Sequence, residues 1–168
     1  MKQTRLKQMQ SRMIQKLGSQ QGRRVSAVME EEYHTLCSKD AERSPDLLRH
    51  LHNNIFPVAA AFRALLQEGM SREEAADLAS DAFLELMEKD AALIQRLCKI
   101  PGVYRLIPKL FGTLMPKLFK ADAGFAFQFY IKGWNRVKFD MLRCPYYEIC
   151  QEIGCLEVAP VFCTTDDL

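Results

Sequence analysis

The sequence has 168 residues, of which 48% are hydrophobic and 26% charged, so it suits one globular domain with a sizeable core. No run of 18 apolar residues is present, and no apolar segment follows the basic N-terminus, which argues against a membrane-spanning helix and a usual secretory signal. The net charge of +2 conceals an asymmetry, because residues 1–24 carry seven basic residues and no acid, whereas residues 144–168 carry five acids and no lysine or arginine.

The basic N-terminus predicts a helix over residues 2–17 that Gly18 ends, and Gly22 separates it from a second helix over about 23–39. A basic segment of this kind can bind nucleic acid. No aromatic residues are interleaved with its cations, so we interpret the charge as a solvated helix face and expect no nucleic-acid partner.

Ser44 and Pro45 mark the start of a long helix, because serine is a favoured N-cap and proline fits the first helical position. Apolar residues at the helical repeat continue the pattern to about Glu68, and Gly69 ends it. Pro57 lies inside this stretch, and we expect a kink there because the proline ring removes a backbone hydrogen bond.

A capping box from Ser71 to Glu74 predicts the start of the next helix, whose apolar side runs through Met87. Residues 103–120, further along, are apolar and basic and are interrupted by prolines. That composition fits an amphipathic surface helix.

The hydrophobic period then changes from that of a helix to two. Alternating apolar positions lie on both sides of Gly133: Phe125, Phe127, Phe129, Ile131, Val137, Phe139 and Met141. This pattern predicts a β-hairpin with one apolar face. Because an isolated two-stranded hairpin is marginal in water, it must pack against helices or further strands.

The last 25 residues carry the strongest chemical signal. Pro145 fits the first position of a short helix and Gly154 the position after its end, which makes Cys144 the N-cap. Helix N–H groups and the helix dipole stabilise a thiolate there, so Cys144 is a candidate nucleophile. The alternative is a buried cysteine that only packs. Since no export signal is visible, we expect a cytoplasmic protein whose six cysteines are reduced thiols.

Other groups near the C-terminus allow further chemistry. Four cysteines fall within 20 residues: Cys144, Cys150, Cys155 and Cys163. They are spaced more widely than the tight pair that usually opens a structural zinc site, so a shared metal is an alternative only. The carboxylates of Glu157 and Asp166 or Asp167 could activate a water or simply stay solvated. The histidines all lie in the N-terminal third, so a cysteine–histidine pair would require that third to fold against the tail.

Together these elements predict an α+β fold in which a helix-rich N-terminal two-thirds is followed by a β-hairpin and short cysteine-bearing helices. We divide the chain into a basic N-terminal helix or arm, residues 1–24, and a single α+β domain, residues 25–168. Within that domain the helical half covers about 25–120, and the hairpin and cysteine-rich tail cover about 121–168.

The tail also resembles a known family. The stretch from Phe139 to Tyr147 and several residues after it are similar to the L-2-amino-thiazoline-4-carboxylic acid hydrolase family, and so is the helical part from about residue 45. The tail residues that match the recurrent positions of that family are Cys144, Glu157, Cys163 and Asp166. Members continue through another strand-like segment, so the resemblance implies that a chain ending at Leu168 is shortened at its C-terminus.

The resemblance implies hydrolytic opening of a small thiazoline ring, or of a related cyclic amidine-type carboxylic acid, to a carbamoyl-cysteine without a cofactor. The nucleophile would be the Cys144 thiolate or a water activated by Glu157 or Asp166. Arg143 or Lys138 would pair with the carboxylate of this small-molecule substrate. The alternative function is a non-enzymatic metal-binding, redox or ligand-sensing module built on the clustered cysteines.

Overall fold

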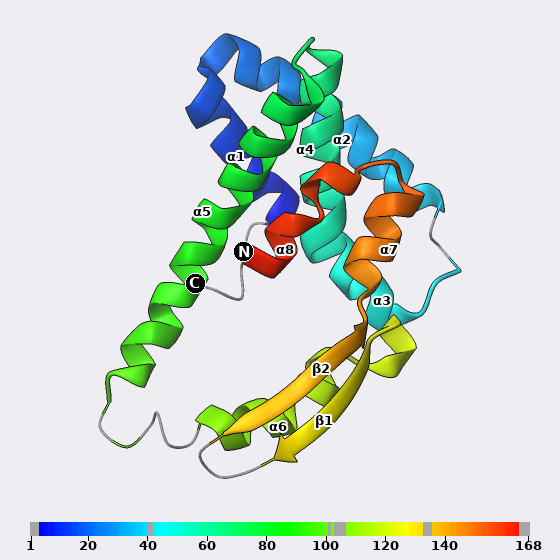
Figure 1. The fold of residues 1–168 in the computed structure, drawn as a ribbon. Coiled ribbons are helices and arrows are strands. Elements are labelled where there is room, and N and C mark those ends of the chain that lie inside the picture. Colours follow the sequence, from blue (N-terminus) through cyan, green and yellow to red (C-terminus); the bar gives the residue numbers. More distant parts are fainter. Residues whose placement is uncertain (1–3, 40–41, 101, 103–106, 133–135, 165–168) are drawn as a thin grey trace.

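The computed structural model describes the chain except for residues 1–3, 40–41, 101, 103–106, 133–135 and 165–168. It is a helix-rich α+β fold with an antiparallel hairpin, which confirms the predicted class (Figure 1). The elements in chain order are α1 (Arg5–Leu17), α2 (Ser19–Lys39), α3 (Pro45–His50), the π-helical turn η1 (Leu51–Ile55), α4 (Phe56–Gln67), α5 (Arg72–Cys98), α6 (Ile107–Leu118), the 3-10 turn η3 (Ala121–Ala123), β1 (Ala126–Lys132), β2 (Val137–Arg143), α7 (Pro145–Glu152), the 3-10 turn η4 (Leu156–Val158) and α8 (Pro160–Thr164). Within the described residues, no helix is both long and apolar enough to cross a membrane.

The first two helices meet at Gly18, which ends α1 with a positive φ of 79°. The sequence pattern placed a second break at Gly22, and this was wrong, because α2 begins at Ser19 and Gly22 lies inside it. The reason is a tertiary contact: a Cβ on Gly22 would lie 2.5 Å from the Cα of Ile14. Glycine at this position therefore permits the close crossing of α1 and α2.

The basic helix α1 packs into the main core through Leu6, Met9 and Met13, which are all buried. Its cations form ion pairs with acids of other helices. Lys7 Nζ lies 2.8 Å from Glu30 on α2, and Lys16 Nζ lies 2.7 Å from an oxygen of Glu85 on α5. The positive charge of α1 is thus partly neutralised within the molecule.

The long helix predicted from Pro45 is present but is not α-helical throughout. Its N-cap is formed as expected, since Ser44 Oγ accepts the N–H of Leu47 at 3.2 Å. The five residues before α4 form the π-helical turn η1, and Pro57 follows at the start of α4. Because proline has no N–H to donate, a break in the α-helical hydrogen-bond ladder at this point is physically expected.

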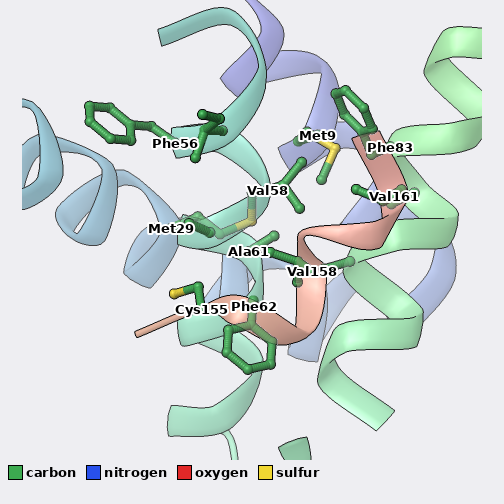
Figure 2. Close-up of a cluster of buried hydrophobic side chains, with 14 of the residues drawn as sticks. Met9, Met29, Phe56, Val58, Ala61, Phe62, Phe83, Cys155, Val158 and Val161 are labelled. Atoms are coloured by element: carbon green, nitrogen blue, oxygen red, sulfur yellow. The ribbon is translucent and has the colours of Figure 1, made fainter. Parts of the chain in front are cut away.

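Helix α4 is the centre of the core. Nine of its twelve residues are buried, because α1, α2, α5 and η4 pack around it. Figure 2 shows Phe62 of α4 and the side chains that converge from the other elements, among them Met9, Met29, Phe83 and Val158. Burial of a phenylalanine of this kind stabilises the fold by roughly 1.5–3 kcal/mol.

Helix α5 begins with the predicted capping box. Ser71 N–H donates to Glu74 Oε2 at 3.0 Å, and Glu74 N–H donates to Ser71 Oγ at 3.3 Å. The two reciprocal bonds satisfy N–H groups that a helix start would otherwise leave unpaired. The helix continues to Cys98, well beyond the apolar pattern that the sequence shows up to Met87.

Residues 99–143, which we call the arm, leave the end of α5, form α6 and return through the hairpin. In Figure 1 the arm stands off from the bundle of α1, α2 and α4. Phe129 pairs with Phe139 and Phe127 with Met141 across the strands, with two irregularities in register. The rings of Phe127, Phe129 and Phe139 contact one another, and α6 packs against both strands. The hairpin therefore has the helical support that its length requires.

After the hairpin, α7, η4 and α8 bring the chain back onto the helical bundle. Helix α7 contacts η1, and η4 and α8 contact α5. Phe162 of α8 packs edge-to-face against Phe83 of α5, with ring centroids 5.5 Å apart. The cysteine-bearing tail is thus fixed against α4 and α5 rather than extending into solvent.

Candidate functional site

Cys144 lies where β2 ends and α7 begins. Its backbone is extended, with φ −127° and ψ 111°, as an N-cap residue requires, and Pro145 follows as the first helical residue. The Cys144 side chain is half-buried and makes no capping hydrogen bond. The first-turn N–H groups of α7, which have no partners inside the helix, lie beside this position. Cys144 therefore occupies the N-cap position at a strand-to-helix junction, as the sequence predicts.

The start of α7 is held by the segment after α6. Gly124, with φ 90°, approaches so closely that a Cβ there would lie 3.4 Å from the Cβ of Pro145. Ser44 Oγ donates to the carbonyl of Asp122 at 2.6 Å, which ties η3 to the beginning of α3. The start of α7 thus packs against the end of η3, which is itself tied to α3.

A hydrogen-bonded chain of polar side chains lies next to this junction. Asn54 Nδ2 donates to Tyr146 Oη at 2.9 Å, and Tyr146 Oη lies 2.9 Å from His50 Nδ1. His50 Nε2 lies 3.0 Å from the carbonyl oxygen of Leu118. Because that carbonyl only accepts, Nε2 carries the proton, so Nδ1 accepts from the tyrosine hydroxyl. All four groups are satisfied when the imidazole is neutral.

The surroundings of His50 favour this neutral form. The ring stacks on Phe119 at 5.6 Å and contacts Phe125 edge-on at 5.1 Å. Burial lowers the pKa of His50 below its ordinary value of 6.5, although the bond to the Leu118 carbonyl acts in the opposite direction. At neutral pH the network therefore contains an uncharged imidazole.

Two of the tail cysteines serve the packing. The N–H of Cys155 donates to the carbonyl of Cys150 at 2.8 Å, and Gly154 has a φ of 70°, so α7 ends in a Schellman motif as its glycine predicts. Both sulfurs are buried, and Figure 2 shows Cys155 among the core side chains. Burial raises the pKa of Cys150 to about 12 and also raises that of Cys155. Both are protonated thiols at neutral pH.

Two arginines fix the turn that follows α7. Arg63 donates to the carbonyl of Ile153 at 2.5 Å and to Glu32 Oε2 at 3.1 Å. Arg72 donates to Glu157 and, at 3.2 Å, to the carbonyl of Gly154. Its guanidinium hydrogen bond lowers the pKa of Glu157. Glu157 is therefore an ionised carboxylate engaged by an arginine.

The predicted site residues occupy separate positions around α7. Cys144 and Glu157 lie beyond opposite ends of this eight-residue helix, which has an axial length of ~12 Å. Cys163 is exposed on α8, and Asp166 lies outside the described residues.

The two predicted substrate-binding cations both lie on β2. Arg143 forms two hydrogen bonds of 2.7 Å with Glu148, one to each carboxylate oxygen. Lys138 lies over the ring of Tyr130, with its Nζ 5.6 Å from the centroid. Arg143 and Cys144 are neighbours in the chain, as the last residue of β2 and the N-cap of α7.

Sequence reasoning missed Asn54 and Tyr146 and did not link His50 to the tail. A signal was available for one of them, since His50 and Asn54 are four residues apart and fall on one side of an otherwise apolar helical stretch. No sequence signal connects either residue with Tyr146, which is more than 90 residues away. Among the residues that the structure describes, no group of three histidine, cysteine, aspartate or glutamate side chains is arranged to hold a metal ion.

A family model described as L-2-amino-thiazoline-4-carboxylic acid hydrolase matches residues 48–168. The matched region begins in α3 and contains the polar network, the Cys144 junction and the arginine-held turn. No curated protein and no solved structure matches the chain.

Proposed function

The chain belongs to the L-2-amino-thiazoline-4-carboxylic acid hydrolase family, and on that premise we propose that it opens a small thiazoline or related cyclic amidine-type carboxylic acid at a site built on Cys144. The observation that carries the assignment of the site is the partly exposed position of Cys144 at the N-cap of α7. Of the cysteines in the tail, Cys150 and Cys155 are buried and protonated, which makes them poor nucleophiles.

The chemistry suits a thiolate nucleophile. The C2 carbon of the thiazoline ring is bonded to one sulfur and two nitrogens and becomes electrophilic when the ring nitrogen is protonated. The Cys144 thiolate would add to C2, the ring C2–S bond would break, and the released substrate thiolate would take a proton. Water would then add to C2 and the Cys144 thiolate would leave, giving the carbamoyl product with one water consumed.

The first turn of α7 supports this route electrostatically. Tyr146 and Tyr147 contribute backbone N–H groups at the helix start, where the helix dipole stabilises negative charge on a nearby sulfur. For the substrate carboxylate we propose Arg143 or Lys138. Arg143 would have to exchange its present partner Glu148 for the substrate, whereas Lys138 is exposed on the same strand.

The second route is a water activated by Glu157 or Asp166. The ion pair with Arg72 keeps Glu157 ionised, which suits a base, but it also occupies the carboxylate. We therefore favour the Cys144 thiolate as the nucleophile.

The test compares two accessible thiols with the same assay. The thiol released from a 2-aminothiazoline carboxylic acid would be measured for wild-type protein, Cys144→Ser and Cys163→Ser. We expect at least a hundredfold loss of kcat/KM for Cys144→Ser, with an unchanged far-ultraviolet circular dichroism spectrum, and a smaller effect for Cys163→Ser. Full activity of Cys144→Ser together with a large loss in Glu157→Gln would replace the thiolate by the activated water.

A further inference from the structure

The exposed large hydrophobic side chains of this protein gather on one part of the molecule. Among the described residues eight such side chains are exposed, and six belong to the arm: Ile100, Leu114, Leu118, Tyr130, Met141 and Leu142. The other two, Tyr147 and Leu156, follow it in the chain. The side chains described between residues 4 and 92 contribute none. Single exposed apolar residues are ordinary on a protein surface, but the concentration of six of these eight in one segment marks an interaction surface.

The same segment concentrates positive charge. By sequence the arm contains nine lysines and arginines and two aspartates, a net charge of +7, so the remaining residues carry −5 of the overall +2. Among the described side chains, two of the arm's cations pair with acids outside it, Lys120 with Asp46 and Arg143 with Glu148. Discounting these two still leaves +5. The arm therefore combines a net positive charge with exposed apolar side chains. Residues 1–24 also carry seven cations, but Lys7, Arg12 and Lys16 pair with acids of α2 and α5.

The apolar and basic side chains are interleaved along the arm. On α6, Leu114 and Leu118 are one helical turn apart and 44% and 52% exposed, and Lys117 between them is exposed as well. On β2, Leu142 is 64% exposed and Lys138 of the same strand is exposed. Such a surface is complementary to the interface of an anionic lipid bilayer, where negatively charged headgroups lie directly above apolar acyl chains.

Other polyanionic or apolar partners match less well. A second copy joined arm to arm would bring two strongly positive segments together. A second copy joined through its acidic part would offer few exposed large hydrophobics to meet the leucines of the arm, and among the described side chains these are Tyr147 and Leu156. Nucleic acid would satisfy the cations but gives no apolar layer for Leu118 and Leu142.

We propose that the arm is a peripheral binding surface for bilayers rich in anionic lipids. Its cations lie at the headgroups while the side chains of α6 and the hairpin enter the interfacial region, and the acidic remainder of the molecule faces away from the membrane. In Figure 1 the end of α5, α6 and the hairpin lie together on the side opposite α1 and α2, so the arm can meet a flat surface without unfolding the core. This inference does not require the proposed hydrolase activity, although Lys138 and Arg143 of the arm are also the residues proposed for the substrate carboxylate.

The experiment is vesicle flotation of the full chain. Vesicles of phosphatidylcholine alone and vesicles with about one third phosphatidylglycerol would be compared at low and high salt. We expect binding to the anionic vesicles, weak binding to the neutral ones, and a decrease with salt. Each cation at such a surface contributes about fivefold to partitioning, so Lys117→Glu with Arg136→Glu should weaken binding by about 25-fold or more.

Matched variants distinguish binding through the arm from a general effect of net charge or of exposed hydrophobic residues. Arg23→Glu with Lys39→Glu makes the same charge change at exposed positions of α2 and should retain most of the binding. Leu142→Ser should weaken binding clearly more than Leu156→Ser, which alters an exposed leucine of η4. Circular dichroism of each variant verifies that the fold is retained.

Several results would overturn the proposal. One is equal binding to neutral and anionic vesicles, and another is equal loss in the α2 and arm charge variants. Tighter binding to a single-stranded oligonucleotide than to anionic vesicles would assign the arm to nucleic acid instead. A dimer in light scattering that the Leu142→Ser substitution dissociates would assign the surface to a second copy.

Discussion

Replacing Tyr146 by phenylalanine tests whether the polar network fixes α7 to the rest of the fold. The substitution removes one oxygen and keeps the ring, which stacks on Phe162 with centroids 4.9 Å apart. That oxygen accepts from Asn54 Nδ2 and donates to His50 Nδ1, each at 2.9 Å. The variant therefore breaks two hydrogen bonds without creating a large cavity.

The expected cost follows from the two bonds. Each contributes about 0.5–1.5 kcal/mol net, and the partial exposure of the site lets water replace some of the lost interaction. We expect the free energy of unfolding to fall by about 1–2 kcal/mol. For a chain of 168 residues this lowers the melting temperature by about 2–8 °C.

The assay is urea unfolding followed by circular dichroism, with Tyr147→Phe as the matched control. Tyr147 is the next residue of α7 and is 55% exposed, so its loss of a hydroxyl should cost less than about 0.5 kcal/mol. A double-mutant cycle of Tyr146→Phe with Asn54→Ala should give a coupling energy of about 0.5–1.5 kcal/mol. Equal stability of the two tyrosine variants, or a coupling energy of zero, would refute the network as a stabilising element.

Two further predictions concern the histidine of the network and the helix crossing. Burial lowers the pKa of His50 in the folded state below 6.5, so the unfolded chain binds the proton at a higher pH than the folded one. The free energy of unfolding should therefore keep its full value above about pH 6.5 and decrease as the pH falls below it. Urea midpoints between pH 7.5 and 5.5 would show this slope, and His50→Gln should flatten it; an unchanged slope contradicts the assignment. Gly22→Ala should lower the free energy of unfolding by about 1–3 kcal/mol, because its Cβ would lie 2.5 Å from the backbone of α1. Ser26→Ala, one turn further along α2, should lower it less in the same measurement.

Local sequence signals predicted the beginnings and ends of several helices correctly. The Ser71–Glu74 capping box and the glycines at positions 69 and 154 act through hydrogen bonds within a few residues, so the local sequence contains the relevant partners. The alternation around Gly133 likewise predicted both strands, because side chains on one face of a hairpin recur every second residue.

The same local reasoning failed at Gly22, which was assigned to a break although it lies inside α2. A glycine at a helix crossing and a glycine that ends a helix look alike in the sequence. Only the distance to Ile14, on another helix, distinguishes them. The π-helical turn before Pro57 was also not predicted, because the sequence indicated a disturbance there but not its geometry.

For the candidate site, the sequence by itself determined the strand end, the N-cap position of Cys144 and the family, since each depends on residues close together in the chain. The tertiary structure decided which cysteines are accessible, which arginine engages Glu157, and that His50 and Asn54 meet Tyr146. Those properties depend on burial and on contacts between residues up to 96 positions apart, and both arise only when the tail packs against the helical bundle.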